Sequence, residues 1–408
     1  MTVVSGAGEP GKPVLRHRAL RWLLAGSTVN VFGGSLTPVA IAFAVLDLGG
    51  SATDLGLVEA AYALCQVVTT LAGGVLGDRV SRTLMLEGAS AVSAVVVGTL
   101  AALVVTGVAT IPLIAVLSSL SGVVGALGQP SSRAIVRLVV PEDELARAVA
   151  VRAFLQTGAA AVGYATAGIL VVVIGSGWAI ATDAVTYAVA AVCFTRLDVP
   201  HVPAGRQESL LTDFGEGLRE VLRHTWLWSQ ILMAALYHLF YGGAQSVLGP
   251  IVVGDGIGRS VWGLALGFLM GGFVLGSVVC LRWRPRHGLF VGVCLLTLTG
   301  CFPLAMALTD RVTVLLAGAL LHGFGLQIYT VFWETSINLN VPQDRLARVY
   351  SIDIAGSFLT RPIGLALTGP VAALVGFHGW LVVVAAVISG AAVLSLISGD
   401  VRRLQTTG

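Results

Sequence analysis

The chain has 408 residues, of which 56% are hydrophobic and only 11% are charged. Soluble globular domains carry about 25% charged residues, so this composition excludes a water-soluble fold, although the length alone would allow two or three soluble domains. The formal net charge of +3 is too small to imply an acidic partner, and no nucleic acid is expected to bind.

Twelve stretches are apolar and long enough to cross a membrane as helices, because one span needs about 20 mainly apolar residues. Residues 1–19 are polar, lack the apolar core of a signal peptide, and are expected to form an N-terminal tail. The first bundle, 20–196, has spans at 20–46, 54–77, 83–107, 111–138, 145–174 and 177–196. The second, 225–398, has spans at 226–253, 261–281, 288–308, 312–340, 346–375 and 377–398. The sequence therefore predicts an all-α membrane protein of two six-helix bundles, with a C-terminal tail over 399–408.

A polar segment over 197–224 separates the two predicted bundles and carries prolines and charges of both signs. Its second part, from about Leu210, has apolar residues at helical spacing between Leu211 and Leu222. That pattern predicts an amphipathic helix lying on a surface rather than crossing the membrane.

The basic residues indicate the orientation of the chain. All but three of the 24 Lys and Arg residues fall on the side that carries both termini and the linker. Arg259 and Arg311 fall on the opposite side, and Arg361 falls inside a span. Because basic residues concentrate on the cytosolic side, both termini are predicted to be cytosolic. The expected location is the bacterial cytoplasmic (inner) membrane, which the chain crosses many times.

The two halves carry a sequence repeat at an offset of 201 residues. Residues 140–147 read VPEDELAR and residues 341–348 read VPQDRLAR, so six of eight positions match. At the same offset, Gly163 and Gly168 align with Gly364 and Gly369. Helix-start chemistry alone would explain the proline and the acids, but not their shared order and offset. A duplicated six-helix unit places a substrate site between the halves near the middle of the membrane.

A glycine-rich loop follows the second span, where residues 73–82 read GGVLGDRVSR. It resembles the signature loop of the major facilitator superfamily, roughly G-x-x-x-D-R-x-G-R-R, with Ser81 and Thr83 replacing a glycine and a basic residue. The resemblance covers nearly the whole chain in helix count and spacing, and it implies a secondary transporter with the major facilitator fold. It also implies a conformational-switch loop formed by Gly74, Asp78, Arg79 and Arg82.

Within that superfamily, the second half looks most like the exporter group that includes bacterial enterobactin and drug efflux proteins. The resembling segments read WET at 333–335, VP at 341–342, RVYS at 348–351 and PIGLA at 362–366. Proton-linked drug exporters often carry G-P-x-x-G-G in span five. Here Tyr164 replaces the proline and Ala167 replaces a glycine. This departure weakens the expectation of a standard antiporter.

Two pairs of opposite charges are related by the repeat offset and are expected to act as gates. Arg133 corresponds to Glu334, and Arg152 corresponds to Asp353. An ion pair between the halves that forms and breaks is what alternating access requires. We therefore predict that Arg133 and Glu334 lock the inner ends of the halves together.

Several residues are expected to line a central cavity, because the resemblance implies that spans one, four, seven and ten face it. The polar and aromatic residues at mid-depth in these spans are Asn30, Thr37, Tyr237, His238, Tyr241, Gln245, Gln327, Tyr329 and Trp333. Arg361, about 22 Å into span eleven, joins them, with a structural ion pair as the alternative. A charge in lipid costs about 2.5–3.5 kcal/mol and therefore indicates function.

Three residues are candidates to carry a coupling proton, namely Glu59, His238 and Glu334. Imidazole and buried carboxylate groups can change protonation in the physiological range. His322, in the outer half of span ten, ranks lower, and Asp183 is expected near the outer start of span six.

The predicted function is proton-motive-force-driven efflux of a small hydrophobic or amphiphilic organic compound, such as a drug, siderophore or secondary metabolite. Such an antiporter would contribute to multidrug resistance. An importer of the same fold, or a non-transporting membrane sensor or assembly factor, is the alternative; an intramembrane enzyme would need catalytic residues grouped at one depth. No phosphate-binding loop occurs in the sequence, so no ATP, metal or other cofactor is expected. The expected partners are a small-molecule substrate, protons and the lipid bilayer, and the chain is expected to act as a monomer.

Overall fold

The computed structural model describes residues 14–77, 81–197, 199, 210–343 and 345–405, and this part of the chain is almost entirely helical with no strand. Eleven of its segments are long and apolar enough to cross a membrane. Helix α2 (Ala52–Gly77) lies beside them in the first bundle, which completes the predicted twelve spans.

The first bundle consists of α1 to α6. Besides α2, its helices are α1 (Arg18–Asp47), α3 (Arg82–Val105), α4 (Ile111–Val139), α5 (Glu142–Ile174) and α6 (Ser176–Phe194). The predicted spans agree with these bounds to within a few residues. Gly175 has a φ of 86°, in the left-handed region that glycine adopts freely, and it joins α5 to α6 without a longer loop.

The second bundle is less regular than the first. Its spans are α8 (Thr225–Gly243) continued by π-helical turns at Ala244–Leu248 and Pro250–Asp255, α9 (Arg259–Arg282), α10 (Gly288–Leu296) with α11 (Cys301–Leu308), α12 (Val312–Asn340), α13 (Leu346–Phe358) with α14 (Thr360–Val375), and α15 (Phe377–Ser395). The break between α13 and α14 lies just before Pro362. A proline has no N–H to give the carbonyl four residues earlier, so the helix bends there.

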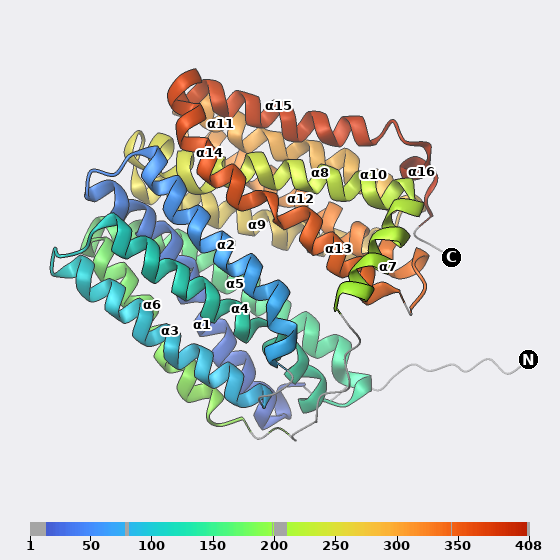
Figure 1. Cartoon of the computed structure of the whole chain (residues 1–408), viewed down its shortest axis with the longest axis horizontal. Helices are drawn as coiled ribbons and strands as arrows, with labels where there is room; N and C mark the ends of the chain where they lie inside the picture. Colours follow the sequence, from blue (N-terminus) through green and yellow to red (C-terminus); the bar gives the residue numbers. More distant parts are fainter. Residues whose placement is uncertain (1–13, 78–80, 198, 200–209, 344, 406–408) are drawn as a thin grey trace, which may run out of the picture.

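Three short elements lie outside the membrane spans. They are a 3₁₀ turn at Val14–Arg16, helix α7 (Leu210–Arg223) in the linker, and α16 (Gly399–Arg403) near the C-terminus. Helix α7 is the amphipathic helix predicted for the second part of the linker. In Figure 1 it lies at the same end of the molecule as α16, against α13.

The outer surface of both bundles is apolar. Large aliphatic side chains point outward and are highly exposed, including Leu374 at 86%, Val173 at 71% and Val95 at 69%. Exposure of this extent suits contact with lipid tails, where the helices satisfy their own backbone hydrogen bonds.

The residues of the sequence repeat make equivalent helix–helix contacts in the two bundles. A Cβ added at Gly163 of α5 would lie 2.6 Å from the carbonyl oxygen of Phe32 in α1. The equivalent Gly364 of α14 meets the carbonyl oxygen of Leu239 in α8 in the same way. The two aligned glycines therefore hold equivalent helices together inside each bundle, as small residues do in membrane proteins.

Candidate functional site

The two bundles meet through two closely packed pairs of helices, α5 with α9 and α2 with α14. At the first crossing, a Cβ on Gly263 would lie 2.6 Å from the carbonyl oxygen of Tyr164. At the second crossing, a Cβ on Gly56 would lie 2.5 Å from the carbonyl oxygen of Leu365. Tyr164 and Leu365 are related by the 201-residue offset. The contacts therefore form two pseudo-symmetric seams between the bundles, which we call the outer seal.

The second glycine of each repeat pair completes the outer seal. A Cβ on Gly168 would lie 2.9 Å from Cα of Ser260, and one on Gly369 would lie 2.5 Å from Cα of Thr53. Both crossings lie in the half of the molecule that faces away from α7 and α16 (Figure 1). Backbones this close leave no room for any side chain, so the outer ends of the bundles are shut.

A charged contact reinforces the outer seal at its rim. A guanidinium nitrogen of Arg259, at the start of α9, lies 2.7 Å from Oδ1 of Asp47, at the end of α1. The same guanidinium lies 4.6 Å from the ring centroid of Phe43 and 3.2 Å from Asp255. In the sequence, Arg259 was notable only as one of two basic residues on the outer side. Its pairing with Asp47 depends on how the two bundles pack together, and a local sequence pattern cannot predict that packing.

Immediately inward of the outer seal, charged and aromatic residues from both bundles come together. Glu59 lies one helical turn inward of Gly56 on α2, and Arg361 lies one turn inward of Leu365 on α14. Six residues lie within electrostatic range of Arg361: Glu59, Tyr62, Tyr164, Tyr237, His238 and Tyr241. Of these, Tyr62 and Tyr164 were not predicted as site residues. We call the six residues, with Arg361, the mid-depth cluster.

The backbone of the second bundle positions Arg361. The break at Leu359 is tied to α8 by Thr360, whose hydroxyl donates to the carbonyl oxygen of Ala235 over 2.7 Å. The stem of Arg361 then passes over Gly242 of α8, where an added Cβ would lie 3.2 Å from Cγ of the arginine. A glycine at 242 therefore makes the room that the arginine occupies.

His322 is a structural member of the second bundle. Its Nδ1 lies 2.6 Å from the carbonyl oxygen of Thr299, which fixes the proton on Nδ1, and its Nε2 then accepts from the Tyr237 hydroxyl at 2.7 Å. Thr299 needs this donor because residue 303, four positions on, is proline. The ring also stacks on Tyr241 with centroids 4.2 Å apart, so His322 holds two tyrosines of the mid-depth cluster in place.

Asp183 lies deeper than the sequence suggested. It is the eighth residue of α6 and is 1% exposed, not a residue at the outer start of the span. The hydroxyls of Thr37 and Thr186 both donate to its carboxylate. Thr37 was predicted to line the cavity, but its hydroxyl donates a hydrogen bond to Asp183 within the first bundle.

The remaining predicted cavity residues lie in two different environments. Tyr329 and Trp333 are 6% and 7% exposed and pack with Trp226 in the core of the second bundle, away from the mid-depth cluster. Gln327 packs against Gly276 of α9. Asn30 and Gln245 are half-buried on α1 and on the π-helical continuation of α8.

The predicted gate residues sit at equivalent inner positions of the two bundles. Arg152 donates from two nitrogens to Ser132, at 2.8 Å and 2.7 Å. Asp353 accepts from Trp333, which is related to Ser132 by the same offset, at 3.1 Å. Each member of this pair is thus bonded to the helix before it in its own bundle. Glu334 is exposed, and the side chain of Arg133 lies outside the described residues.

The predicted switch loop lies mostly outside the described part of the chain. Asp78 and Arg79 fall on residues that the structure does not describe. Gly74 belongs to the last turns of α2, and Arg82 is the first residue of α3. Ser81 caps α3, because its side chain accepts a hydrogen bond from the backbone N–H of Leu84.

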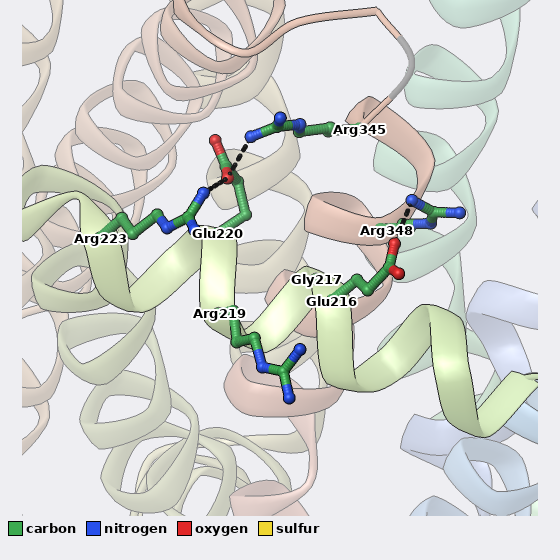
Figure 2. Close-up of a pocket in the computed structure, with 7 residues that line it drawn as sticks. All are labelled: Glu216, Gly217, Arg219, Glu220, Arg223, Arg345 and Arg348. Carbon is green, nitrogen blue, oxygen red and sulfur yellow. Dashed lines mark hydrogen bonds and ion pairs between the residues drawn. The ribbon is translucent and has the colours of Figure 1, made fainter.

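The inner end of the second bundle holds the linker helix α7 by charge. A pocket of about 280 Å³ lies between α7 and α13, lined by Glu216, Gly217, Arg219, Glu220, Arg223, Arg345 and Arg348. Figure 2 shows Arg345 reaching Glu220 and Arg348 reaching Glu216, at 2.6 Å and 2.5 Å. In the first bundle, Glu144, at the repeat position of Arg345, binds Arg16 and His17 just before α1. The repeated loop therefore anchors the segment that enters each bundle.

The contact between α7 and α13 is expected to respond to acid. Burial raises the pKa of Glu220, but the hydrogen bond and charge of Arg345, with those of His224, outweigh burial and leave this pKa below its ordinary value. A carboxylate with a lowered pKa stabilises the folded form above that range, and this contribution is lost as pH falls through the folded pKa. We expect α7 to stay docked at neutral pH and to loosen only in acid.

Removal of the Glu220 charge should release α7 at neutral pH. Glu220→Gln leaves Arg345 without its carboxylate, so amide exchange in 215–223 should accelerate several-fold, as measured by hydrogen–deuterium exchange. Asp143→Asn, at an exposed position in the first turn of α5, is the matched control and should change nothing in that segment. Unchanged exchange in the Glu220 variant would show that packing of Gly217 on α13, not charge, holds the helix.

Comparison with known proteins identifies the family. The family model described as "Major Facilitator Superfamily" matches residues 23–285. The chain is 22% identical to macrolide efflux protein A of Streptococcus pyogenes over 394 residues, covering 93% of this chain and 96% of that protein. It is 25% identical to the multidrug efflux pump Tap of Mycolicibacterium fortuitum over 368 residues, covering 85% and 87%.

Solved structures share the same fold. A bacterial homologue of the human lysosomal transporter Spinster, in an inward-facing and unoccupied conformation, matches with a TM-score of 0.73 at 15% identity, covering 97% of this chain and 98% of that one. The nucleoside transporter NupG matches with a TM-score of 0.67 at 12% identity, covering 93% and 97%. With two six-helix bundles, the repeat between them and a family match over more than half of its length, the chain belongs to the Major Facilitator Superfamily and is a membrane transporter.

Proposed function

We propose that this transporter exports a small hydrophobic or amphiphilic organic compound across the bacterial cytoplasmic membrane, driven by the proton-motive force. The observation that carries this proposal is the mid-depth cluster, in which both bundles contribute aromatic rings and a few polar groups around Arg361 and Glu59. Binding sites for organic molecules have this composition, mostly apolar and aromatic with a small number of orienting polar groups.

The direction of transport rests on the relatives. Two proteins named for efflux, one of macrolides and one of several drugs, align with this chain over most of its length. The nucleoside transporter among the solved structures shares the fold only, so it gives no direction for this chain.

Alternating access would use the outer seal as one of two gates. In the described conformation the bundles are in contact at the outer glycines, and a substrate would enter the mid-depth cluster from the cytosolic side. For release outside, the seal must open while the inner ends close. The residues proposed for the inner gate are Arg133, Glu334, Arg152 and Asp353, with the loop of Asp78 and Arg79 relaying the change. Glu59 is the proposed proton carrier nearest the seal.

Transport in inverted membrane vesicles tests the proposal. With the cytosolic face outward, energised vesicles should take up a lipophilic fluorescent compound, and a protonophore should abolish the uptake. Vesicles without the protein set the background. Uptake that ignores the protonophore would refute proton coupling, and accumulation only in right-side-out vesicles would identify an importer.

A further inference from the structure

The arginine of the mid-depth cluster has donors without acceptors. A guanidinium carries five N–H donors and no acceptor. Within the described residues, Arg361 has no hydrogen bond and no ion pair, although its side chain is half-buried and lies within a membrane span. Its stem is fixed over Gly242, so its position is set by packing and not by a bound carboxylate. A charged side chain without an ion pair is costly within a membrane span and therefore indicates function, which here is the binding of an anionic partner.

A second unpartnered donor belongs to the residue that precedes Gly242, over which Arg361 passes. Tyr241 immediately precedes Gly242 on α8 and is 5% exposed, and its hydroxyl has no hydrogen-bond partner in the part of the chain that the structure describes. Its ring is held by stacking on His322 and on Tyr237, with centroids 4.2 Å and 5.1 Å apart. The mid-depth cluster thus holds an unpartnered aromatic hydroxyl within electrostatic range of the Arg361 guanidinium, and an oxyanion is a chemical partner for both donors.

Glu59 is a carboxylate within electrostatic range of Arg361, but among the described residues no ion pair joins the two. It comes from α2 of the first bundle, whereas Arg361 comes from α14 of the second. Asp183 is occupied by two threonine hydroxyls and is 1% exposed, so it cannot take this role. Glu59 therefore balances the charge of Arg361 without filling its N–H donors.

We propose that Arg361 and Tyr241 form a subsite for an oxyanion, such as a carboxylate or sulfonate, on the amphiphilic substrate, and that Glu59 competes with that group for Arg361. A planar guanidinium holds a carboxylate through two parallel N–H···O bonds, and such bonds are roughly twice as strong as neutral ones. This inference rests on the proposed function and narrows it to amphiphiles that carry an acidic group.

The competition predicts effects of opposite sign at the two charges. Removing the guanidinium by Arg361→Gln should weaken binding of an acidic amphiphile, because the positive charge that pairs with the ligand's anionic group is lost. Removing the internal competitor by Glu59→Gln should strengthen the same binding. A site built for cationic amphiphiles would show the reverse, since Glu59 would then be the binding group.

The test uses three dansyl probes with the same undecyl chain, ending in a carboxylate, a primary amide or an amine. Fluorescence titration of the purified full-length protein should give a carboxylate affinity at least tenfold above that of the amide. Arg361→Gln should remove this preference and leave amide binding intact, while Glu59→Gln should raise the carboxylate affinity several-fold. Arg311→Gln, an exposed arginine at the start of α12, is the matched control and should behave as the wild type.

Two outcomes would overturn the inference. A preference for the amine that Glu59→Gln abolishes would make the subsite cationic. Equal affinity for the three probes in the wild type would mean that the charged group of the ligand is not recognised. Energised uptake of the amide probe into inverted vesicles separates these results from failure of the proposed function, because it depends on export and not on Arg361. If Arg361→Gln lost amide binding as well, Arg361→Lys, which keeps the charge, should restore carboxylate binding in part; if it did not, the inference would fail.

Discussion

Gly263→Leu should abolish transport while leaving both bundles folded. Any side chain at 263 would enter the backbone of α5, because even a Cβ would lie 2.6 Å from the carbonyl oxygen of Tyr164. Overpacking of this kind costs about 1–3 kcal/mol. A free-energy change of that size would shift the equilibrium between the closed and the open outer seal about 5- to 150-fold. The outer seal would then stay open, and the transporter could not complete its cycle.

The control for this change lies on the same helix. A Cβ at Gly271 of α9 would meet only the end of Leu320, at 3.7 Å, so Gly271→Ala should retain transport where Gly263→Ala already impairs it. Gly56→Ala, at the pseudo-symmetric crossing, should reproduce the defect. Opening is measured by labelling Ala52→Cys, a buried position beside Gly369 in the outer seal, with a membrane-impermeant thiol reagent from outside, in a background without the five native cysteines. Unchanged labelling in Gly263→Leu would mean that the outer seal still closes when a side chain separates α5 from α9, which would contradict the prediction.

The sequence predicted the spans well because each depends on local composition. The span boundaries and the amphipathic helix from Leu210 both follow from where apolar residues stand along the chain. The repeat even identified four glycines, Gly163, Gly168, Gly364 and Gly369, as equivalent pairs. It did not show that the first of each pair packs inside a bundle and the second packs between bundles.

The candidate site was predicted less completely, because its geometry depends on the rotation of each helix. Glu59 and Arg361 were each recognised as charges inside spans, yet their proximity depends on the crossing of α2 with α14. Tyr62, one turn from Glu59, was missed, and Tyr164 was seen only as a missing proline. Conversely, Tyr329 and Trp333 were placed in the cavity by their depth, but the structure turns them into the core of the second bundle.

His322→Leu should destabilise the second bundle strongly, because His322 is fully buried and makes two hydrogen bonds. The substitution keeps the volume of the side chain but removes both hydrogen bonds, so the carbonyl of Thr299 and the hydroxyl of Tyr237 are left unpaired in a dry interior. Each buried unpaired group costs about 1–3 kcal/mol. A clear drop in the thermal midpoint of the detergent-solubilised protein is the expected result, together with weaker transport, because Tyr237 and Tyr241 lose the ring that holds them.

A second substitution tests the physical reason for this loss. The Thr299 carbonyl depends on His322 because Pro303 cannot supply the helical N–H, so Pro303→Ala should return a backbone donor to it. Pro303→Ala in the His322→Leu background should therefore recover part of the lost stability, and the two changes should be non-additive. His378→Leu, at an exposed outer position, is the matched control. Strict additivity would show that the carbonyl finds another donor, and the role of His322 would then reduce to its contacts with the two tyrosines.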